Sequence, residues 1–256
     1  MKRWSILSAA AGLGLFFVSC AGAASAAEIT VLSTTAMDGV LKKLIPEFER
    51  GTGNKIALTL QTSGAAEKRI ASGEVTPDVA ILTGPLIDDL IREGKVIAGS
   101  KQDIARLSMG VGVRAGAAKP DIGSTDAFKQ ALLAAKTIAY PDPAGGGATG
   151  IYLVKLLAQL GIADAVRAKT KLATGPVGAL LVNGSAELGV QQIPELKAVP
   201  GVDIVGPLPP DLQTITVLTL GIVTGSKQPE AANAFVKFLV SPAAVSEIRA
   251  RGMDPG

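Results

Sequence analysis

Segments with the patterns of strands and of helices alternate along most of the chain, and this alternation constrains the fold more than any other feature. Short β-branched runs typical of buried strands stand at 28–33, 55–61, 78–82, 107–114, 137–140, 188–192 and 215–224. Helical patterns stand between and after them, at 36–50, 65–72, 85–93, 126–135, 151–160, 177–183 and 229–240. Repeated strand–helix units predict parallel-rich sheets with helices on both faces, so the expected fold class is α/β.

Two further expectations concern the second half of the chain. The helical pattern at 229–240 is expected to close the fold. The stretch 200–211 is rich in proline and glycine, and it is the best candidate for a crossing between two domains.

Residues 1–26 have the pattern of a secretory signal peptide. A basic pair at 2–3 precedes an uncharged apolar run at 6–18, and the Ala-Ser-Ala at 24–26 fits a cleavage site for small residues. Two alternatives stay open: an uncleaved membrane anchor, and a lipoprotein that is acylated at Cys20. All three place the remaining chain outside the cytoplasm, and we expect it in the periplasm.

Composition excludes several classes of function. The chain has no histidine, and its one cysteine and one tryptophan fall in the signal segment, as do two of its 25 basic residues. The remainder, with 23 basic against 22 acidic residues, has no charge excess for nucleic acid. Without histidine and cysteine, a Ser-His-Asp triad and the usual zinc sites are impossible. We therefore expect no enzyme, no metal, no cofactor and no nucleic-acid partner.

Small polar residues gather in loops that follow predicted strands. Ser33-Thr34-Thr35 and Thr62-Ser63-Gly64 each end a strand and open a helix, and the glycine-rich segment 145–150 does the same later in the chain. Hydroxyls and free backbone N–H groups at helix starts can bind an anion, although each loop taken alone is more typical of an ordinary helix cap. Three such loops together predict a shared anion site at the carboxyl ends of the strands.

Catalytic or nucleotide-binding motifs are weak by comparison. The glycines at 145, 147 and 150 match G-x-G-x-x-G, but no strand ending in an acidic residue follows at the expected distance. Ser63 and Lys68 lie five residues apart, on different faces of a helix, and the pair Asp88-Asp89 fits a solvated helix face. These patterns favour binding over catalysis.

The chain resembles the periplasmic molybdate-binding proteins of ABC importers, which have the type II periplasmic binding fold. The segments that carry the resemblance are ITVLSTTAMDGVLKKLIPEFERGTG (29–53), TSGAAEKRIASGEVTPDVAIL (62–82), PDPAGGGATGIYLVKLL (141–157), GALLVNGSAELGV (178–190) and AANAFVKFLVSPAA (231–244). The resemblance implies two doubly wound α/β lobes joined by crossing strands. Lobe 1 would contain 27–112 and 212–256, and lobe 2 would contain 113–211.

The resemblance also implies site residues, and some positions match directly. Ser63 matches the serine of the second loop. Thr149 falls where the family offers a backbone N–H before a Gly-Ile-Tyr sequence. Pro176 or Val177 falls at another backbone donor, and Val177 alone of the two has an N–H to give.

Two positions depart from the family pattern. The serine of the first loop aligns with Ala36, so that Ser33, Thr34 or Thr35 would have to substitute for it. The site tyrosine aligns with Gln192, whose amide can accept as well as donate a hydrogen bond. These departures leave the fold unaffected and put the identity of the ligand in question.

The resulting hypothesis is a monomeric extracytoplasmic receptor that binds a small oxyanion between two lobes and delivers it to the permease of an ABC transporter. Molybdate or tungstate is the first ligand expected, and a small organic carboxylate is the alternative. An exported hydrolase on a related scaffold, and a receptor that signals through a membrane protein, are the less favoured alternatives.

Overall fold

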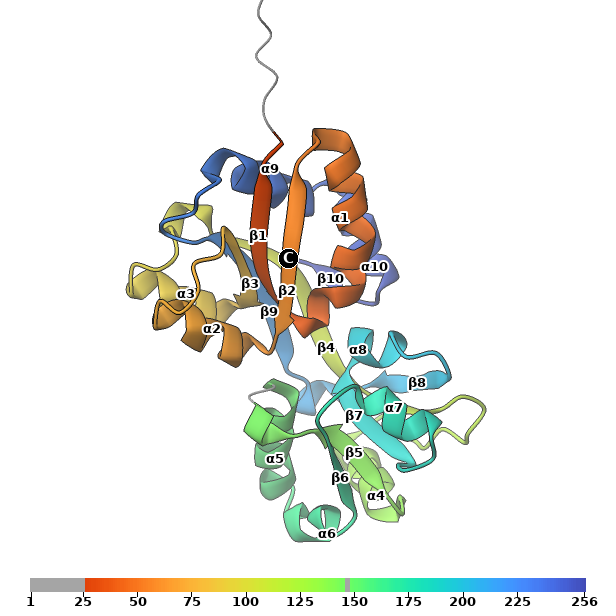
Figure 1. The fold of residues 1–256 in the computed structure, drawn as a ribbon. Helices are drawn as coiled ribbons and strands as arrows, with labels where there is room; N and C mark the ends of the chain where they lie inside the picture. Colours follow the sequence, from red (N-terminus) through yellow and green to blue (C-terminus); the bar gives the residue numbers. More distant parts are fainter. Residues whose placement is uncertain (1–25, 146–147) are drawn as a thin grey trace, which may run out of the picture.

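The computed structural model describes residues 26–145 and 148–256, with the backbone alone at residue 148. The signal segment up to residue 25, including Cys20, and the glycines at 146 and 147 lie outside the described residues. Figure 1 shows two lobes, one above the other, connected by extended strands. Every helix in the described residues is too short or too polar to cross a membrane.

Ten strands and ten α-helices make up the described chain. The strands are β1 (Glu28–Thr34), β2 (Lys55–Gln61), β3 (Val79–Thr83), β4 (Gln102–Arg114), β5 (Ile138–Pro141), β6 (Thr170–Ala173), β7 (Leu188–Gln192), β8 (Val202–Pro207), β9 (Ile215–Ile222) and β10 (Asp254–Pro255). The helices are α1 (Asp38–Thr52), α2 (Ser63–Ala71), α3 (Gly84–Arg92), α4 (Thr125–Ala134), α5 (Ala148–Gln159), α6 (Ala163–Arg167), α7 (Val177–Val182), α8 (Ile193–Lys197), α9 (Pro229–Leu239) and α10 (Pro242–Ala250).

Each lobe has a sheet that combines parallel and antiparallel strands. In lobe 1, β2, β1 and β3 run parallel, and β9 and β4 continue the sheet in antiparallel order. In lobe 2, β5 is parallel to both β6 and β7, whereas β7 and β8 are antiparallel to β4. The expected α/β class and the doubly wound arrangement are confirmed.

The long strand β4 belongs to both sheets. Its residues from Gln102 to Ser108 pair with β9, and from Met109 onward the same strand pairs with β7 and β8. The change of sheet lies close to the lobe boundary expected at residue 112. The return path between the lobes runs from the end of β8 into β9, so that two extended segments connect the lobes.

Side chains on the return path hold the two connections together. The side-chain amide of Gln213 accepts from the Met109 backbone N–H at 2.9 Å and donates to the Met109 carbonyl at 2.9 Å. Tyr152 on α5 donates its hydroxyl to the Leu212 carbonyl at 2.9 Å. Two hydrogen bonds from one amide mimic a strand pairing, and they fix the return path against β4 at the point where β4 changes sheets.

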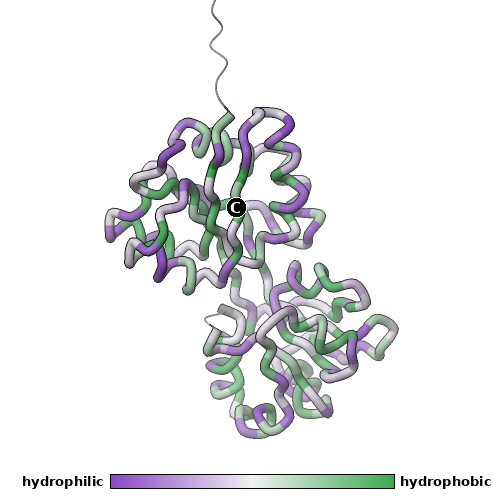
Figure 2. The backbone as a smooth tube through the Cα atoms, in the orientation of Figure 1, coloured by the Kyte–Doolittle hydropathy of each residue, from purple (hydrophilic) through white to green (hydrophobic). Residues whose placement is uncertain are grey.

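Alternating strand residues build apolar layers on both faces of each sheet. In lobe 1, Val79 and Ile81 of β3 pack beneath α1, α9 and α10, whereas Ala80 and Leu82 pack beneath α2 and α3. Lobe 2 has the same division, with one cluster beneath α4 and α5 and a smaller one beneath α7 and α8. Figure 2 shows the apolar segments concentrated along the strands of both lobes. This two-sided burial explains the near-continuous apolar strands of the sequence.

The structure corrects two expectations about the second half of the chain. The stretch 200–211 is not itself the crossing, because Val202–Pro207 form β8 and pair with β4 inside lobe 2. The helix α9 does not close the fold, because α10 and β10 follow it and β10 pairs with β4. Proline is tolerated in these places since Pro207 ends an edge strand and Pro242 occupies a helix start.

Candidate ligand-binding site

The first strand of lobe 1 brings three predicted hydroxyl residues toward lobe 2. In Figure 1, β1 runs from the far end of lobe 1 toward lobe 2, and Thr34 is its last residue. Ser33 is fully buried, and its hydroxyl donates to the Thr34 carbonyl at 3.3 Å. Thr34 is also buried, and its side chain does not cap the following turn, whereas Thr35 is exposed. Thr34 is therefore the buried member of this loop whose hydroxyl makes no hydrogen bond among the described residues.

In the second loop of lobe 1, one residue caps the helix and the next is the candidate ligand donor. Thr62 is the N-cap of α2, and its hydroxyl accepts from the Ala65 N–H at 3.3 Å. Ser63, the first residue of the helix, is almost completely buried, and its hydroxyl makes no hydrogen bond within the described residues. The cap explanation of this loop thus applies to Thr62, and the Ser63 hydroxyl is left for another partner.

Gln61, the last residue of β2, is a polar group that the sequence analysis did not single out. Its side-chain oxygen is buried and has no hydrogen-bond partner among the described residues. A buried acceptor without a partner is costly, since it has lost its water without gaining a donor. Its position two residues before Ser63 makes it a candidate to contact the same ligand.

In lobe 2, Thr149 lies in the first turn of α5 and is buried. Gly150 follows it and packs so closely on the end of β5 that a Cβ there would overlap the Pro141 carbonyl. The absence of a side chain at Gly150 thus lets α5 begin directly against β5. The other half of the predicted glycine loop, Gly146 and Gly147, lies outside the described residues.

Val177, the predicted backbone donor of α7, is already engaged inside lobe 2. Its N–H donates to the side-chain oxygen of Gln191 at 3.1 Å, and both residues are buried. Gly189 makes this approach possible, because a Cβ at Gly189 would stand 2.7 Å from the Val177 side chain. An anion could use the Val177 N–H only after displacing the Gln191 amide.

Gln192, which replaces the tyrosine of the family pattern, bridges lobe 2 to a crossing strand. Its side-chain nitrogen donates to the Thr216 hydroxyl of β9 at 3.0 Å. Only 6% of Gln192 is exposed. The amide therefore stands at the hinge between the lobes, where a ligand or a change in lobe orientation would alter its hydrogen bond.

Glu195 on α8 is the second group that the sequence analysis missed. The side chain is partly buried, and burial raises the pKa of Glu195 to about 7, against the opposing effect of a hydrogen bond with the Gln191 side chain. In sequence it looked like an ordinary acidic residue in the first turn of a helix. Its burial comes from packing of α8 against β4, β7 and β8, which local sequence does not reveal.

The two sets of residues come from opposite lobes. Lobe 1 contributes hydroxyls at the ends of β1 and β2, and lobe 2 contributes amides and a carboxylate at the end of β7 and on α8, which lies on the side of lobe 2 nearest lobe 1. No hydrogen bond among the described residues joins the lobe 1 set directly to the lobe 2 set. No group of acidic side chains in the described part of the chain is arranged to hold a metal ion.

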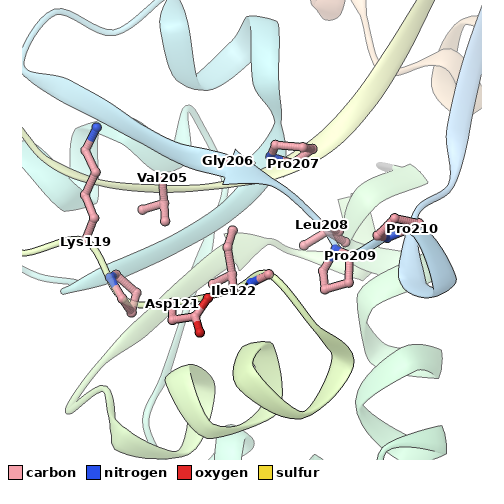
Figure 3. A pocket seen from close by; sticks show the side chains of 11 residues that line it. Lys119, Asp121, Ile122, Val205, Gly206, Pro207, Leu208, Pro209 and Pro210 are labelled. Carbon is pink, nitrogen blue, oxygen red and sulfur yellow. Dashed lines mark hydrogen bonds between the residues drawn. The ribbon is translucent and has the colours of Figure 1, made fainter.

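Two surface hollows lie away from these residues. One, of about 450 Å³, is formed in lobe 2 by the loop around Asp121 and the proline-rich segment that follows β8 (Figure 3). The other, of about 300 Å³, lies on lobe 1 beside Thr30 and Arg69. Neither contains a residue of the candidate site.

A family model described as bacterial extracellular solute-binding protein matches residues 29–254. The chain belongs to this family. A solute-binding protein of this kind is extracellular by description, in agreement with the expected export, and its family implies a small ligand and an ABC transporter as partner.

Two relatives of this solute-binding protein cover nearly its whole length. The aconitate isomerase of a Pseudomonas species is 37% identical over 234 residues, which cover 89% of this chain and 87% of the relative. The molybdate-binding protein ModA of Azotobacter vinelandii is 30% identical over 259 residues, which cover 94% of each. The two relatives differ in the kind of small molecule that their names give.

Solved structures of similar proteins establish the fold. The periplasmic molybdate-binding protein of Azotobacter vinelandii superposes with a TM-score of 0.70 at 22% identity, covering 88% of this chain and 98% of the other. The tungstate-binding protein TupA of Desulfovibrio alaskensis G20 gives a TM-score of 0.63 at 16% identity, and the superposition covers 90% of this chain and 99% of TupA. The resemblance to molybdate-binding proteins and the type II periplasmic binding fold are both confirmed, whereas molybdate itself as ligand is not.

Proposed function

We propose that this solute-binding protein binds a small organic polycarboxylate between its two lobes. The observation that carries the proposal is the hydrogen bond from the Val177 N–H to Gln191, because it occupies a donor that the family pattern assigns to the oxyanion. Gln192 also stands where the family has a tyrosine. Lobe 2 therefore presents two side-chain amides where the family pattern has a free backbone N–H and a tyrosine hydroxyl. Amides both donate and accept, which suits a ligand with carboxylates and a carbon skeleton.

The relatives support the same choice of ligand. The relative named for aconitate, an unsaturated tricarboxylate, is 37% identical, whereas the relative named for molybdate is 30% identical. We propose that Thr34 and Ser63 of lobe 1 donate to one carboxylate, and that Thr149, Gln191 and Gln192 of lobe 2 contact the remainder. Closure of the lobes over the ligand would be a hinge motion at the β4 and β9 crossing.

We further infer that the protein works as a monomer in the periplasm and presents its ligand to the permease of an ABC transporter. The family assignment and the export pattern of residues 1–26 support this role.

A thermal-shift panel tests the ligand. Purified protein is melted with citrate, cis-aconitate and trans-aconitate, and in parallel with molybdate, tungstate, sulfate and phosphate. A ligand present at a thousand times its dissociation constant stabilises the folded state by about 4 kcal/mol, which gives a clear rise in Tm. A rise with the tricarboxylates alone supports the proposal, whereas a rise with molybdate or tungstate alone would overturn it in favour of an oxyanion.

A second candidate function is isomerisation of the bound carboxylate. The observation that favours it is the 37% identity to a protein named aconitate isomerase over most of both chains. Incubation with pure cis-aconitate or trans-aconitate, followed by separation of the two isomers, tests it. Interconversion above the rate in buffer would make the protein an enzyme as well as a binder.

A further inference from the structure

Gln61 has a buried side-chain oxygen that the fold leaves without a hydrogen-bond donor. Among the residues that the structure describes, two buried side-chain oxygens lack a partner, one on Gln61 and one on Asp38. The other carboxylate oxygen of Asp38 accepts from Lys42 at 2.8 Å, so that carboxylate keeps a partner on α1. The Gln61 oxygen has none, and a buried acceptor without a donor costs stability. A donor from outside the fold would remove that cost.

Strand pairing places Gln61 beside the proposed donors of lobe 1. β1 and β2 run parallel, and Gln61 is the partner of Thr34 at the last position of both strands. Paired residues of neighbouring strands lie about 5 Å apart and point to the same face of the sheet. Leu32, two residues before Thr34, packs beneath α2 and α3, so Thr34 and Gln61 point to this face as well. The helix α2, which covers the face, begins at Ser63.

The three side chains differ in what they can offer a ligand. Thr34 and Ser63 are buried, and neither hydroxyl makes a hydrogen bond among the described residues, so both can donate. The oxygen of Gln61 can only accept. Two hydroxyl donors beside one acceptor match a ligand that has a carboxylate with a hydrogen-bond donor next to it. A carboxylate without such a donor, or an oxyanion without protons, would leave the Gln61 oxygen unpaired.

We propose that Gln61 makes this protein selective for polycarboxylates with a hydroxyl group on the carbon that bears a carboxylate. This inference rests on the proposed polycarboxylate site and narrows its ligand class to α-hydroxy acids. One carboxylate accepts from Thr34 and Ser63, and the neighbouring hydroxyl donates to the Gln61 oxygen. In an α-hydroxy acid both groups are attached to one carbon, which fits three side chains at adjacent strand and helix positions.

The Gln61 side chain can turn toward such a ligand while the backbone stays in place. The residue is half-buried, and its side chain has three rotatable bonds. Because its oxygen has no partner in the fold, moving it to the ligand breaks no hydrogen bond of that oxygen. The backbone on either side is held, by the pairing of β2 with β1 and by Thr62, whose hydroxyl accepts from the Ala65 N–H at 3.3 Å.

Matched ligand pairs test the role of the hydroxyl. Isothermal calorimetry gives the dissociation constants of citrate and of tricarballylate, which is citrate without its hydroxyl. Each enantiomer of malate is compared with succinate in the same way. A hydrogen bond to an otherwise unpaired acceptor should make citrate bind about tenfold to a hundredfold more tightly than tricarballylate. Equal affinities in every pair would overturn the inference and leave the polycarboxylate site in place.

Variants assign the selectivity to Gln61. Gln61→Leu has nearly the same size but no acceptor, and it should abolish the preference for citrate over tricarballylate, mainly by weakening citrate. Gln61→Met is unbranched like glutamine and should give the same result if leucine disturbs the end of the strand. Gln102→Leu replaces an exposed glutamine at the start of β4, in the same sheet, and as the control it should keep the wild-type preference.

Stability separates ligand recognition from a structural role. Gln61→Leu removes an unpaired oxygen, so the variant without ligand should be at least as stable as wild type in denaturant. Lower stability of both Gln61 variants would show that the oxygen serves the fold and would overturn the inference. If Gln61→Leu keeps the preference for citrate, another residue recognises the hydroxyl and the assignment to Gln61 is wrong. If wild-type protein binds no polycarboxylate, the proposed function fails together with this inference.

Discussion

Asp78 in lobe 1 and Glu195 in lobe 2 are both carboxylates withdrawn from water, but their surroundings differ. Asp78 accepts five hydrogen bonds: from the Thr30 N–H and hydroxyl at 2.8 Å each, from the Ser226 hydroxyl at 2.7 Å, and from the Lys227 and Gln228 N–H groups at 2.9 and 3.1 Å. Burial by itself raises the pKa of Asp78, but these hydrogen bonds outweigh it, and the pKa falls below its usual value. For Glu195 burial is opposed only by the Gln191 side-chain amide, and the pKa of Glu195 rises to about 7.

The difference separates a structural carboxylate from a chemically available one. Asp78 uses its full acceptor capacity to tie β1 to the segment before α9, so it has nothing left for a ligand. Glu195 keeps unused acceptor capacity on a partly exposed face. The candidate site residues of the two lobes also differ, since lobe 1 has hydroxyls such as that of Ser63 whereas lobe 2 has the amides of Gln191 and Gln192.

Removing the structural carboxylate should have the largest effect. Asp78→Ala leaves five buried or partly buried donors without an acceptor, and we expect the free energy of unfolding to fall by about 3–5 kcal/mol. Denaturant unfolding measures it. Asp211→Ala, at an exposed aspartate of lobe 2, is the control and should change stability by no more than about 0.5 kcal/mol. A loss below about 1 kcal/mol for Asp78→Ala would refute the structural role.

The two carboxylates should also give opposite dependences of stability on pH. The folded state holds the Glu195 proton more tightly than the unfolded chain, so this residue lowers the free energy of unfolding as pH rises from about 4.5 to about 7. Glu195→Gln removes that loss and should be more stable than wild type at pH 8, by about 1–3 kcal/mol after allowance for partial exposure.

Unfolding of wild type and Glu195→Gln at pH 4 and pH 8 measures this difference, which should nearly vanish at pH 4. Asp78 acts in the other direction: its contribution is complete above about pH 4 and is lost as pH falls through its lowered pKa. Equal stability of wild type and Glu195→Gln at pH 8 would contradict the raised pKa of Glu195.

The hydroxyls of lobe 1 should matter for affinity. Ser63→Ala removes a nearly buried hydroxyl that the fold does not otherwise use, and binding of the ligand identified in the thermal-shift panel should weaken by about 1–3 kcal/mol. Isothermal calorimetry measures it, with Ser72→Ala at the opposite, exposed end of the same helix as control. Equal losses in the two variants would show that α2 is perturbed as a whole.

The smallest effect is expected where lobe 2 meets the return path. Tyr152→Phe removes the hydrogen bond to the Leu212 carbonyl and should lower the free energy of unfolding by about 1 kcal/mol. Tyr140→Phe is the matched control, since the Tyr140 hydroxyl makes no hydrogen bond within the described residues and its loss should change stability less. An equal change of the free energy of unfolding in both variants would show that the Tyr152 hydrogen bond to Leu212 adds no stability of its own.

Local sequence patterns predicted seven strands and seven helices in the right order, but they missed the short elements β6, β8, β10, α6, α8 and α10. The strands expected at 55–61 and 188–192 are β2 and β7 with the same bounds, and the polar loops expected at strand ends lie there. These features depend on the period of apolar residues and on turn residues, which act within a few positions. The misassigned stretch 200–211 shows the limit, because prolines and glycines there obscured the edge strand β8.

The site could be predicted only in part from sequence. Hydroxyl residues after strands mark candidate donors, but whether each is free depends on neighbours far away. Val177 is engaged by Gln191, 14 positions later, and Gln192 is engaged by Thr216, 24 positions later. No local pattern in the chain specifies these pairings.

The sequence by itself predicted an exported α/β protein with polar strand ends, because hydrophobic periodicity and export signals are local properties. The division into two lobes was implied by the family resemblance and not by these local patterns. The tertiary structure alone decided which polar side chains are hydrogen-bonded within the fold and which remain free to contact a ligand. Asp78 is saturated by donors 48 to 150 positions away, and Glu195 is desolvated by strands that are remote in sequence. Hydrogen bonding and burial set the chemistry of a carboxylate, and both arise only when distant segments meet.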